Sequence, residues 1–236
     1  MLISITGSHG FIGTNLREYL TRQIPDVEFD CWDNKIDKPL SDFMLYPQTD
    51  YVIHLAANAN VRESIDDPNK FWHNNLELSQ EVFNQCKMHK TRLAYASTSC
   101  VHEWWKNPYG ISKKAMEHIA PKNSVGLRFT TVYGPGAPSY MLIPKLQNGG
   151  VEYVTDHVRD FVHVEDVCSA MWTALKSDYK GVVDVGSGQS ITIKELAEKF
   201  GHKDLPVKPG ADYEMMDNSV DISAMKSLGW SPTKFL

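Results

Sequence analysis

Tyr109 and Lys113 are the side chains of this sequence whose types and spacing best suit acid–base chemistry. They stand four residues apart at the start of a predicted helix, and this spacing places both on one helical face. A phenol has a pKa of about 10, too high for a base at neutral pH, but a neighbouring ammonium lowers that pKa. Tyr109 could therefore remove a proton from a substrate hydroxyl. The competing interpretation is an ordinary Tyr/Lys pair on a helix surface.

A hydroxyl side chain precedes this pair by one strand–helix unit. Thr98 lies in Ser97-Thr98-Ser99, where a predicted strand ends. Parallel α/β sheets bind their ligands at the carboxyl ends of strands. We therefore expect the Thr98 hydroxyl to lie beside Tyr109 and to share a proton with it. Thr98, Tyr109 and Lys113 form the predicted catalytic group.

A glycine-rich turn joins the first predicted strand to the first predicted helix. In Gly7-Ser-His-Gly10-Phe-Ile-Gly13, the first glycine permits a tight turn and the second lets the backbone approach a pyrophosphate. The third allows close packing of helix and strand, while the helix N-terminus faces the anion. The pattern predicts a dinucleotide site; a glycine-rich turn without a ligand is the alternative.

Asp33 follows the second predicted strand, 20 residues after Gly13. A carboxylate at this position accepts hydrogen bonds from the adenosine ribose hydroxyls and repels a 2′-phosphate. The sequence therefore favours NAD over NADP. The alternative is a solvated loop aspartate without a ligand.

The elements that must position these groups alternate between strands and helices. Short apolar runs predict strands at 2–6, 27–32, 51–55, 93–96 and 125–129. Helical spacing of apolar residues predicts helices at 11–23, 68–89 and 108–120. This alternation predicts an α/β fold, a Rossmann-type doubly wound parallel sheet with helices on both faces.

The organisation changes after Tyr133, where a Gly- and Pro-rich stretch begins. We expect strands at 160–164 and 182–185 to return to the main sheet, with a helix between them. The resulting domains are an NAD-binding domain, 1–133 and 159–186, and a small discontinuous substrate-binding lobe, 134–158 and 187–236. In that lobe, Thr192 and Glu195 form a capping-box pattern that starts a helix.

Composition narrows the classes of function. A net charge of -5 argues against a general nucleic-acid-binding surface. No apolar run is long enough to span a membrane, and the N-terminal segment lacks the features of a signal peptide, so we expect a cytoplasmic protein. The four cysteines form no Cys-x-x-Cys pair, and we expect no metal site.

Several motifs together resemble the extended short-chain dehydrogenase/reductase family, particularly its branch of nucleotide-sugar epimerases and dehydratases. The resemblance covers nearly the whole chain. Besides the glycine-rich turn and the Tyr109/Lys113 pair, it is carried by Asp33-Asn34, His54-Leu-Ala-Ala57, Pro68-x-x-Phe-Trp-x-x-Asn75, Arg159-Asp-Phe-Val-His-Val164 and Leu228-Gly-Trp-Ser-Pro232.

The resemblance implies roles for individual residues. It places the cofactor against Gly7, Gly10, Phe11, Ile12, Gly13, Asp33, Asn34, Leu55, Ala56, Ala57, Asn75, Tyr109 and Lys113. It places the nucleotide sugar against Arg62, Asn75, Thr98, Thr131 and Arg159, with Arg159 on the diphosphate. Arg62 has a second interpretation, a surface salt bridge. The resemblance also implies a homodimer formed through a four-helix bundle of the helices at 68–89 and 108–120.

The residues after Thr98 separate the possible reactions. A resemblance to the 4,6-dehydratases of this family would require an Asp-Glu pair directly after Thr98. This chain has Ser99 and Cys100 there, and neither can do carboxylate chemistry, so dehydration is disfavoured. Epimerisation of a UDP-sugar at carbon 4, through a 4-keto intermediate, is the leading prediction. One alternative is a nucleotide-sugar reductase or epimerase-reductase of the GDP-fucose synthase type, which Thr98-Ser99-Cys100 resembles. The other is a non-catalytic NAD-binding regulatory protein.

The loop from Thr98 to Tyr109 is short, and Thr131 replaces the usual Asn, so the sugar stays unidentified.

Overall fold

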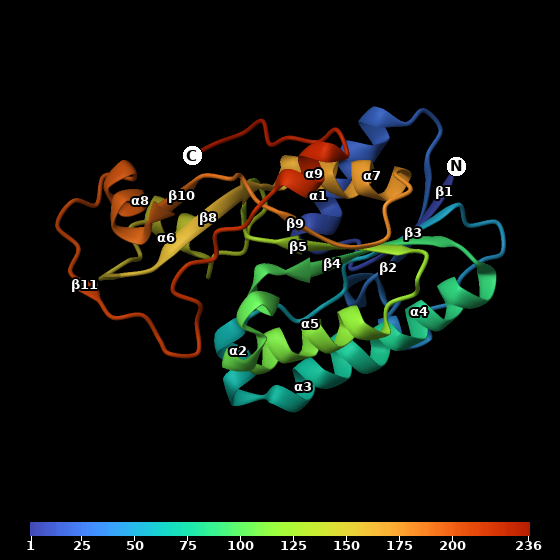
Figure 1. Cartoon of the computed structure of the whole chain (residues 1–236), viewed down its shortest axis with the longest axis horizontal. Helices are drawn as coiled ribbons and strands as arrows, with labels where there is room; N and C mark the ends of the chain where they lie inside the picture. The colour runs from blue at the N-terminus through green and yellow to red at the C-terminus, as the bar shows by residue number, and fades with distance from the viewer.

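The computed structural model describes residues 1–236 and has a six-stranded parallel sheet at its centre (Figure 1). The strands are β1 (Leu2–Thr6), β2 (Glu28–Trp32), β3 (Tyr51–His54), β4 (Arg92–Thr98), β5 (Ser124–Phe129) and β9 (Gly181–Val185). Their order is β2-β1-β3-β4-β5-β9, and every neighbouring pair is parallel. The predicted doubly wound α/β fold is therefore confirmed.

The strand order reverses between β1 and β3. From β1 the chain builds β2 on one side, and from β3 it builds the remaining strands on the other side. Such a reversal opens a crevice at the carboxyl ends of the strands, where ligands bind in sheets of this kind. The stretch between β2 and β3 contains only two short 3-10 turns, Asn34–Ile36 and Leu40–Asp42, so β2 stays at the edge of the sheet.

Helices cover both faces of the sheet. One face carries α1 (Phe11–Gln23), α7 (Val164–Lys176) and α9 (Ser223–Ser227), above the sheet in Figure 1. The other face carries α3 (Pro68–Trp72), α4 (Leu78–His89) and α5 (Pro108–Ile119), with the short α2 (Val61–Asp66) at one end. No helix combines the length and hydrophobicity needed to cross a membrane.

Side chains alternate between these two helical layers because successive strand residues point to opposite faces. Ile53 belongs to the cluster under α1 and α7, whereas its neighbour Val52 belongs to the cluster that packs against α4. Both are completely buried. This two-sided burial explains the continuous apolar runs in the strands.

The long helix predicted for 68–89 is interrupted by a π-helical turn, His73–Glu77, between α3 and α4. Such turns are rare and often lie at functional sites.

The C-terminal part adds a smaller lobe beside the carboxyl edge of the sheet. It holds α6 (Leu142–Gln147), α8 (Ile193–Lys199), a three-stranded sheet and a two-stranded sheet. The strands are β6 (Thr131–Tyr133), β8 (Val158–His163) and β10 (Ser190–Thr192), then β7 (Val154–Thr155) and β11 (Val207–Lys208). The capping box at Thr192 is present at the start of α8.

One strand prediction is wrong. The strand expected at 160–164 does not return to the main sheet, because β8 pairs with β6 and β10 instead. Only β9 joins the main sheet, beside β5. The following helix, α7, packs against α1 over the main sheet. The chain therefore passes from the small lobe back to the main layer between β8 and α7, close to residue 164.

Candidate active site

The glycine-rich turn lies at the carboxyl end of β1 and leads into α1. Gly7 has φ +68°, a backbone conformation that side-chain-bearing residues rarely adopt, and a Cβ there would lie 2.7 Å from the backbone nitrogen of Ala56. A Cβ on Gly13 would lie 2.1 Å from the carbonyl oxygen of Gly7. These contacts match the roles predicted for the first and third glycines.

The beginning of α1 has the properties of an anion site. Gly10 is its N-cap and provides no capping side chain, and the first turn contains no acidic residue. The helix N-terminus thus keeps backbone N–H donors for an anion. Phe11 and Ile12 pack against the large core, so a cofactor would meet their backbone. The turn therefore fits a dinucleotide pyrophosphate.

Asp33 follows β2 directly and lies beside this turn. Its carboxylate accepts hydrogen bonds from the backbone N–H of His9 (2.9 Å) and of Lys35 (2.9 Å). Asn34 begins the 3-10 turn that Asp33 caps. The carboxylate is therefore held next to the glycine turn, in a place that suits the ribose role expected from the sequence.

The segment after β3 lines the same edge of the sheet. The N–H of Leu55 donates to the Thr6 carbonyl (3.0 Å), and the N–H of Ala56 donates to the Thr6 hydroxyl (3.3 Å). Because Ala56 also approaches Gly7, the segment Leu55 to Ala57 borders the glycine turn. These residues were predicted to line the cofactor, and they lie beside the glycine turn that was predicted to hold its pyrophosphate.

Asn75 lies in the π-helical turn and is completely buried. Its amide accepts a hydrogen bond from the N–H of Asn58 (2.8 Å) and donates to the Asn58 carbonyl (2.9 Å). It also donates to the Ser112 hydroxyl (3.1 Å), one residue before Lys113. Asn75 therefore ties the segment after β3 to α5, a positioning role that the sequence pattern did not reveal.

The predicted catalytic group is assembled by β4 and α5. Thr98 is the last residue of β4, and Tyr109 and Lys113 lie in the first two turns of α5. All three are buried, with exposed fractions of 7%, 7% and 2%. Burial raises the pKa of Tyr109 and the Thr98 hydroxyl opposes that rise, which places the two hydroxyl groups near each other. The interpretation of Tyr109 and Lys113 as an ordinary surface pair is wrong.

The acid–base properties differ from the sequence expectation. Burial raises the pKa of Tyr109 and outweighs the Thr98 hydrogen bond, and Lys113 is not among the groups that shift it. Burial also lowers the pKa of Lys113 to about 7, opposed by Glu117. In the chain by itself, burial rather than Lys113 sets the direction of the Tyr109 pKa, because both groups are removed from water. A lowering by Lys113 together with a bound cationic nicotinamide ring stays a prediction.

Two arginines predicted to contact substrate are paired with Glu214. Arg62 Nε lies 3.2 Å from one carboxylate oxygen of Glu214, and Arg159 Nη2 lies 3.4 Å from the other. Arg62 thus makes the surface salt bridge of its second interpretation, and its contact with substrate stays a prediction. Thr131 begins β6, and its hydroxyl accepts a hydrogen bond from the Asn218 amide (3.0 Å).

Glu214 and Asn218 were missed by sequence reasoning. Glu214 lies 152 residues from Arg62, and Asn218 lies 87 residues from Thr131. No spacing rule links residues so far apart. Their only local signal is an acidic and polar character in a Pro- and Gly-rich tail.

A family comparison matches this arrangement. The model of the NAD-dependent epimerase/dehydratase family matches residues 3–186. The chain belongs to that family. NAD is therefore its cofactor, as the glycine turn and Asp33 predicted, and the family consists of enzymes.

Individual relatives are distant but cover nearly the whole chain. It is similar to a UDP-glucose 4-epimerase of Halalkalibacterium halodurans, at 24% identity over 98% of this chain and 91% of that protein. It is also similar to UDP-glucuronate 4-epimerase 1 of Arabidopsis thaliana, at 26% identity over 90% of this chain and 62% of that protein. The first alignment spans 305 positions, so that relative has segments that this chain of 236 residues lacks.

Solved structures share the fold. MoeE5 in complex with UDP-glucose and NAD has a TM-score of 0.87 at 23% identity, covering 100% of this chain and 95% of MoeE5. The UDP-glucose 4-epimerase of Thermus thermophilus, in complex with NAD, has a TM-score of 0.80 at 23% identity, covering 100% of this chain and 95% of that chain. The small lobe is included in both matches.

Proposed function

We propose that this protein is an NAD-dependent epimerase that inverts carbon 4 of a UDP-sugar through a transient 4-keto sugar. The observation that carries the proposal is the buried group of Thr98, Tyr109 and Lys113 at the carboxyl edge of the sheet that also carries the Gly7 turn. A UDP-sugar is favoured because the relatives include UDP-sugar 4-epimerases.

The chain's own residues have complementary tasks in this mechanism. Bound NAD would supply the acceptor and donor of the carbon-4 hydride. Tyr109 would take the proton of the 4-hydroxyl group and later return it to the keto oxygen. The Thr98 hydroxyl would lie beside the phenol and oppose the rise in its pKa that burial causes. Lys113 would contact the bound cofactor, the role that the resemblance gives it. The 4-keto sugar would rotate within the site and take the hydride back on its other face, so the product is the carbon-4 epimer and no net oxidation occurs.

The test is turnover of UDP-glucose and UDP-galactose, followed by NMR. The expected result is interconversion of the two sugars without net reduction of NAD. The substitution Tyr109→Phe should lower kcat by about 10²- to 10⁴-fold, the usual contribution of a positioned acid–base group. A Tyr109→Phe variant that kept full activity would contradict the proposal.

Cys100 supports a second candidate, the epimerase-reductase. Its backbone N–H donates a hydrogen bond to the Thr98 hydroxyl (3.2 Å), and its thiol acts electrostatically on Tyr109, so it lies at the candidate reaction site. Burial raises its pKa, so little of the thiol is ionised at neutral pH. Stoichiometric consumption of reduced cofactor with a GDP-4-keto-sugar would favour this candidate over the epimerase.

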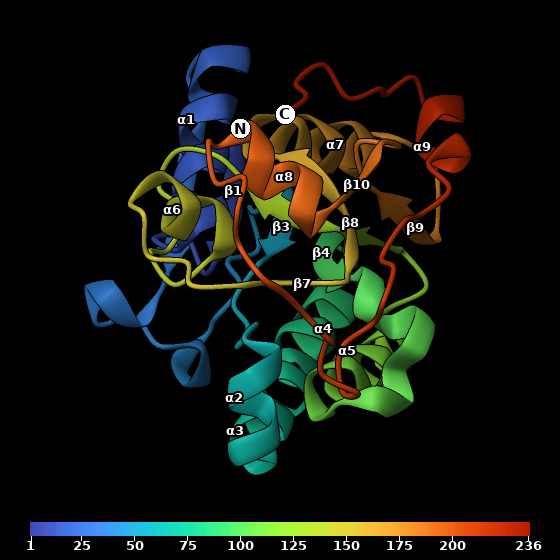
Figure 2. The ribbon, with the colours of Figure 1, turned by 90° about the vertical axis from the view of Figure 1, so that its left-hand side faces the viewer.

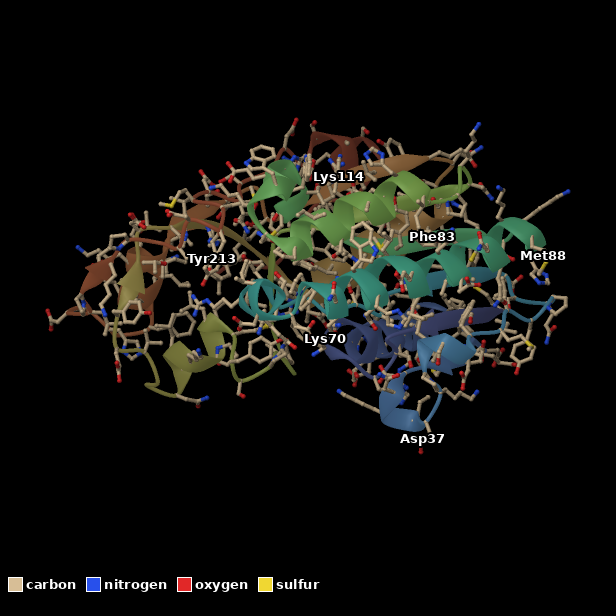
Figure 3. All side chains as sticks on the ribbon, turned by 90° about the horizontal axis from the view of Figure 1, so that it is seen from below. Asp37, Lys70, Phe83, Met88, Lys114 and Tyr213 are labelled. Carbon is tan, nitrogen blue, oxygen red and sulfur yellow. The ribbon has the colours of Figure 1, made fainter.

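We also propose a homodimer through α3–α4 and α5. These helices lie side by side on the face shown in Figure 3. They expose large apolar side chains: Trp72 is 43% exposed, Met88 69% and Ile119 40%. Covering such side chains with a second copy would form a four-helix bundle. Light scattering should give twice the chain mass of 26.7 kDa.

A further inference from the structure

Glu117 is a buried carboxylate on α5, the helix that also carries Tyr109 and Lys113. It follows Lys113 by four residues, so the two side chains lie on one helical face. Only 5% of the Glu117 side chain is exposed. Helix α5 packs against β4 and lies below it in Figure 1 and Figure 2. The carboxylate is therefore enclosed where the helix meets the sheet.

Three hydrogen bonds join this carboxylate to the main sheet. Its Oε1 accepts from the Ser97 hydroxyl (2.7 Å) and from Arg128 Nε (2.8 Å). Its Oε2 accepts from Arg128 Nη2 (2.8 Å), which completes a bidentate ion pair. Ser97 on β4 and Arg128 on β5 are partners in the register of these two strands. Glu117 therefore ties α5 to two adjacent strands at one point.

This tie lies next to the proposed catalytic group. Ser97 directly precedes Thr98 in β4, and Glu117 follows Lys113 by one helical turn. The position of Thr98 relative to Tyr109 and Lys113 depends on how α5 sits on β4. The Lys113 ammonium does not fix that position, because it donates to the sulfur of Met116 on its own helix (3.4 Å). A displacement of about 1 Å in a reacting group can lower a rate on the order of 100-fold.

Glu117 also supplies a negative charge near Lys113. Burial raises the pKa of Glu117, but hydrogen bonds from Arg128 and Ser97 outweigh burial and hold that pKa below its usual value. The carboxylate is therefore ionised at neutral pH. Burial lowers the pKa of Lys113 to about 7, and Glu117 opposes this lowering.

The other groups around Lys113 do not replace this charge. His54 on β3 is affected by the charge of Lys113, but its own pKa of about 3 leaves it neutral near pH 7. The cations nearest to Glu117 are Arg128 and Lys114, whose Nζ lies 3.7 Å from Oε2. The helices packed on the other sides of α5 contribute no group that shifts the pKa of Lys113. Glu117 is therefore the anion on which the charge of Lys113 depends.

We infer that Glu117 is a positioning residue for the proposed reaction. Its carboxylate fixes α5 against the end of β4 and keeps the Lys113 amine in its charged form for contact with the cofactor. An ammonium has three hydrogen-bond donors and a full charge, whereas the neutral amine loses one donor and the charge. The inference rests on the proposed function, because it names a further residue for that same site.

The experiment compares the NAD-loaded wild type with Glu117→Gln. The measured quantities are the pH midpoint of Lys113, by NMR of carbon-labelled lysine side chains, and kcat for UDP-glucose between about pH 5 and 9. Glutamine keeps the size of the side chain and removes its charge, so the Lys113 midpoint should fall by about 1 pH unit or more. Above both midpoints, such a shift leaves about tenfold less ammonium. The kcat of the variant should therefore fall about tenfold further at pH 9 than at pH 5.

Two further variants separate the charge from the tie. Ser97→Ala removes one hydrogen bond of the tie and keeps the carboxylate, so it should lower kcat equally at every pH and leave the Lys113 midpoint unchanged. Glu165→Gln is the matched control, because Glu165 also faces two cations, Arg22 and Lys234, but lies on α7 in the other helical layer. It should match the wild type in both measurements.

A Glu117→Gln variant with the wild-type midpoint and the wild-type pH profile of kcat would overturn the inference, even at reduced stability, and the proposed function would stand. If that variant fails to fold because Arg128 has lost its anion, Glu117→Gln/Arg128→Gln takes its place, with the same expected fall of the midpoint and the same criterion. If the wild type turns over no UDP-sugar, the proposed function fails, and the Lys113 midpoint alone decides whether Glu117 controls that charge.

Discussion

Alanine substitutions at Gly7 and at Gly149 should have different effects on stability and on NAD binding, because only Gly7 lies in close contact with another segment. Gly7 and Gly149 have almost the same backbone angle, φ +68° and +70°. A Cβ on Gly7 would lie 2.7 Å from the Ala56 nitrogen, whereas a Cβ on Gly149 would meet nothing within 4 Å. Gly7→Ala and Gly149→Ala therefore share the strain and differ in the steric overlap.

The magnitudes follow from these two contributions. A left-handed backbone costs an alanine about 1–2 kcal/mol, and this is the whole expected effect of Gly149→Ala. Overpacking adds about 1–3 kcal/mol, so Gly7→Ala should lose roughly 2–5 kcal/mol. For a chain of this size each kcal/mol lowers Tm by about 2–4 °C. Gly7→Ala should also weaken NAD binding at least about tenfold, because Ala56 must move.

The assay is chemical denaturation to measure the free energy of unfolding, together with calorimetric titration of NAD. Gly149→Ala should bind NAD like the wild type. Equal losses of stability in the two variants, with equal NAD affinity, would refute the argument, because the contact with Ala56 would then have no energetic consequence.

Three further predictions concern buried polar groups. Thr98→Val should lower kcat about tenfold or more by removing the hydroxyl beside Tyr109, and Thr98→Ser should restore it; equal kcat values for Val and Ser would contradict this role. Burial, aided by Lys113, lowers the pKa of His54 to about 3. As pH falls, the unfolded chain therefore binds a proton at this residue near pH 6.5, whereas the folded chain binds it only near pH 3. Stability should thus fall as pH drops from about 6.5 to 3, by about 1.4 kcal/mol per pH unit from this group, and His54→Asn should flatten that slope in denaturant titrations. Asp166 accepts hydrogen bonds from the N–H groups of Thr233 and Lys234, so Asp166→Asn should lower Tm and expose the C-terminal tail to carboxypeptidase; an unchanged cleavage rate would show that other contacts hold the tail.

Features that depend on neighbours in the chain were predictable from sequence. Glycines three residues apart produced the turn at Gly7, because backbone conformation and helix entry are local properties. Tyr109 and Lys113 lie on the same face of α5, because a spacing of four residues corresponds to about one helical turn. Apolar runs and helical periodicity predicted the alternating elements of the main sheet, since both faces of that sheet are buried.

Features that depend on distant partners were decided by tertiary structure alone. The strand β8 joined β6 and β10 rather than the main sheet, because strand pairing is set by hydrogen-bonding partners far away in sequence. Glu214 meets Arg62 across 152 residues. The pKa of Tyr109 rises rather than falls, because desolvation depends on the atoms packed around the phenol, and no local pattern specifies that packing.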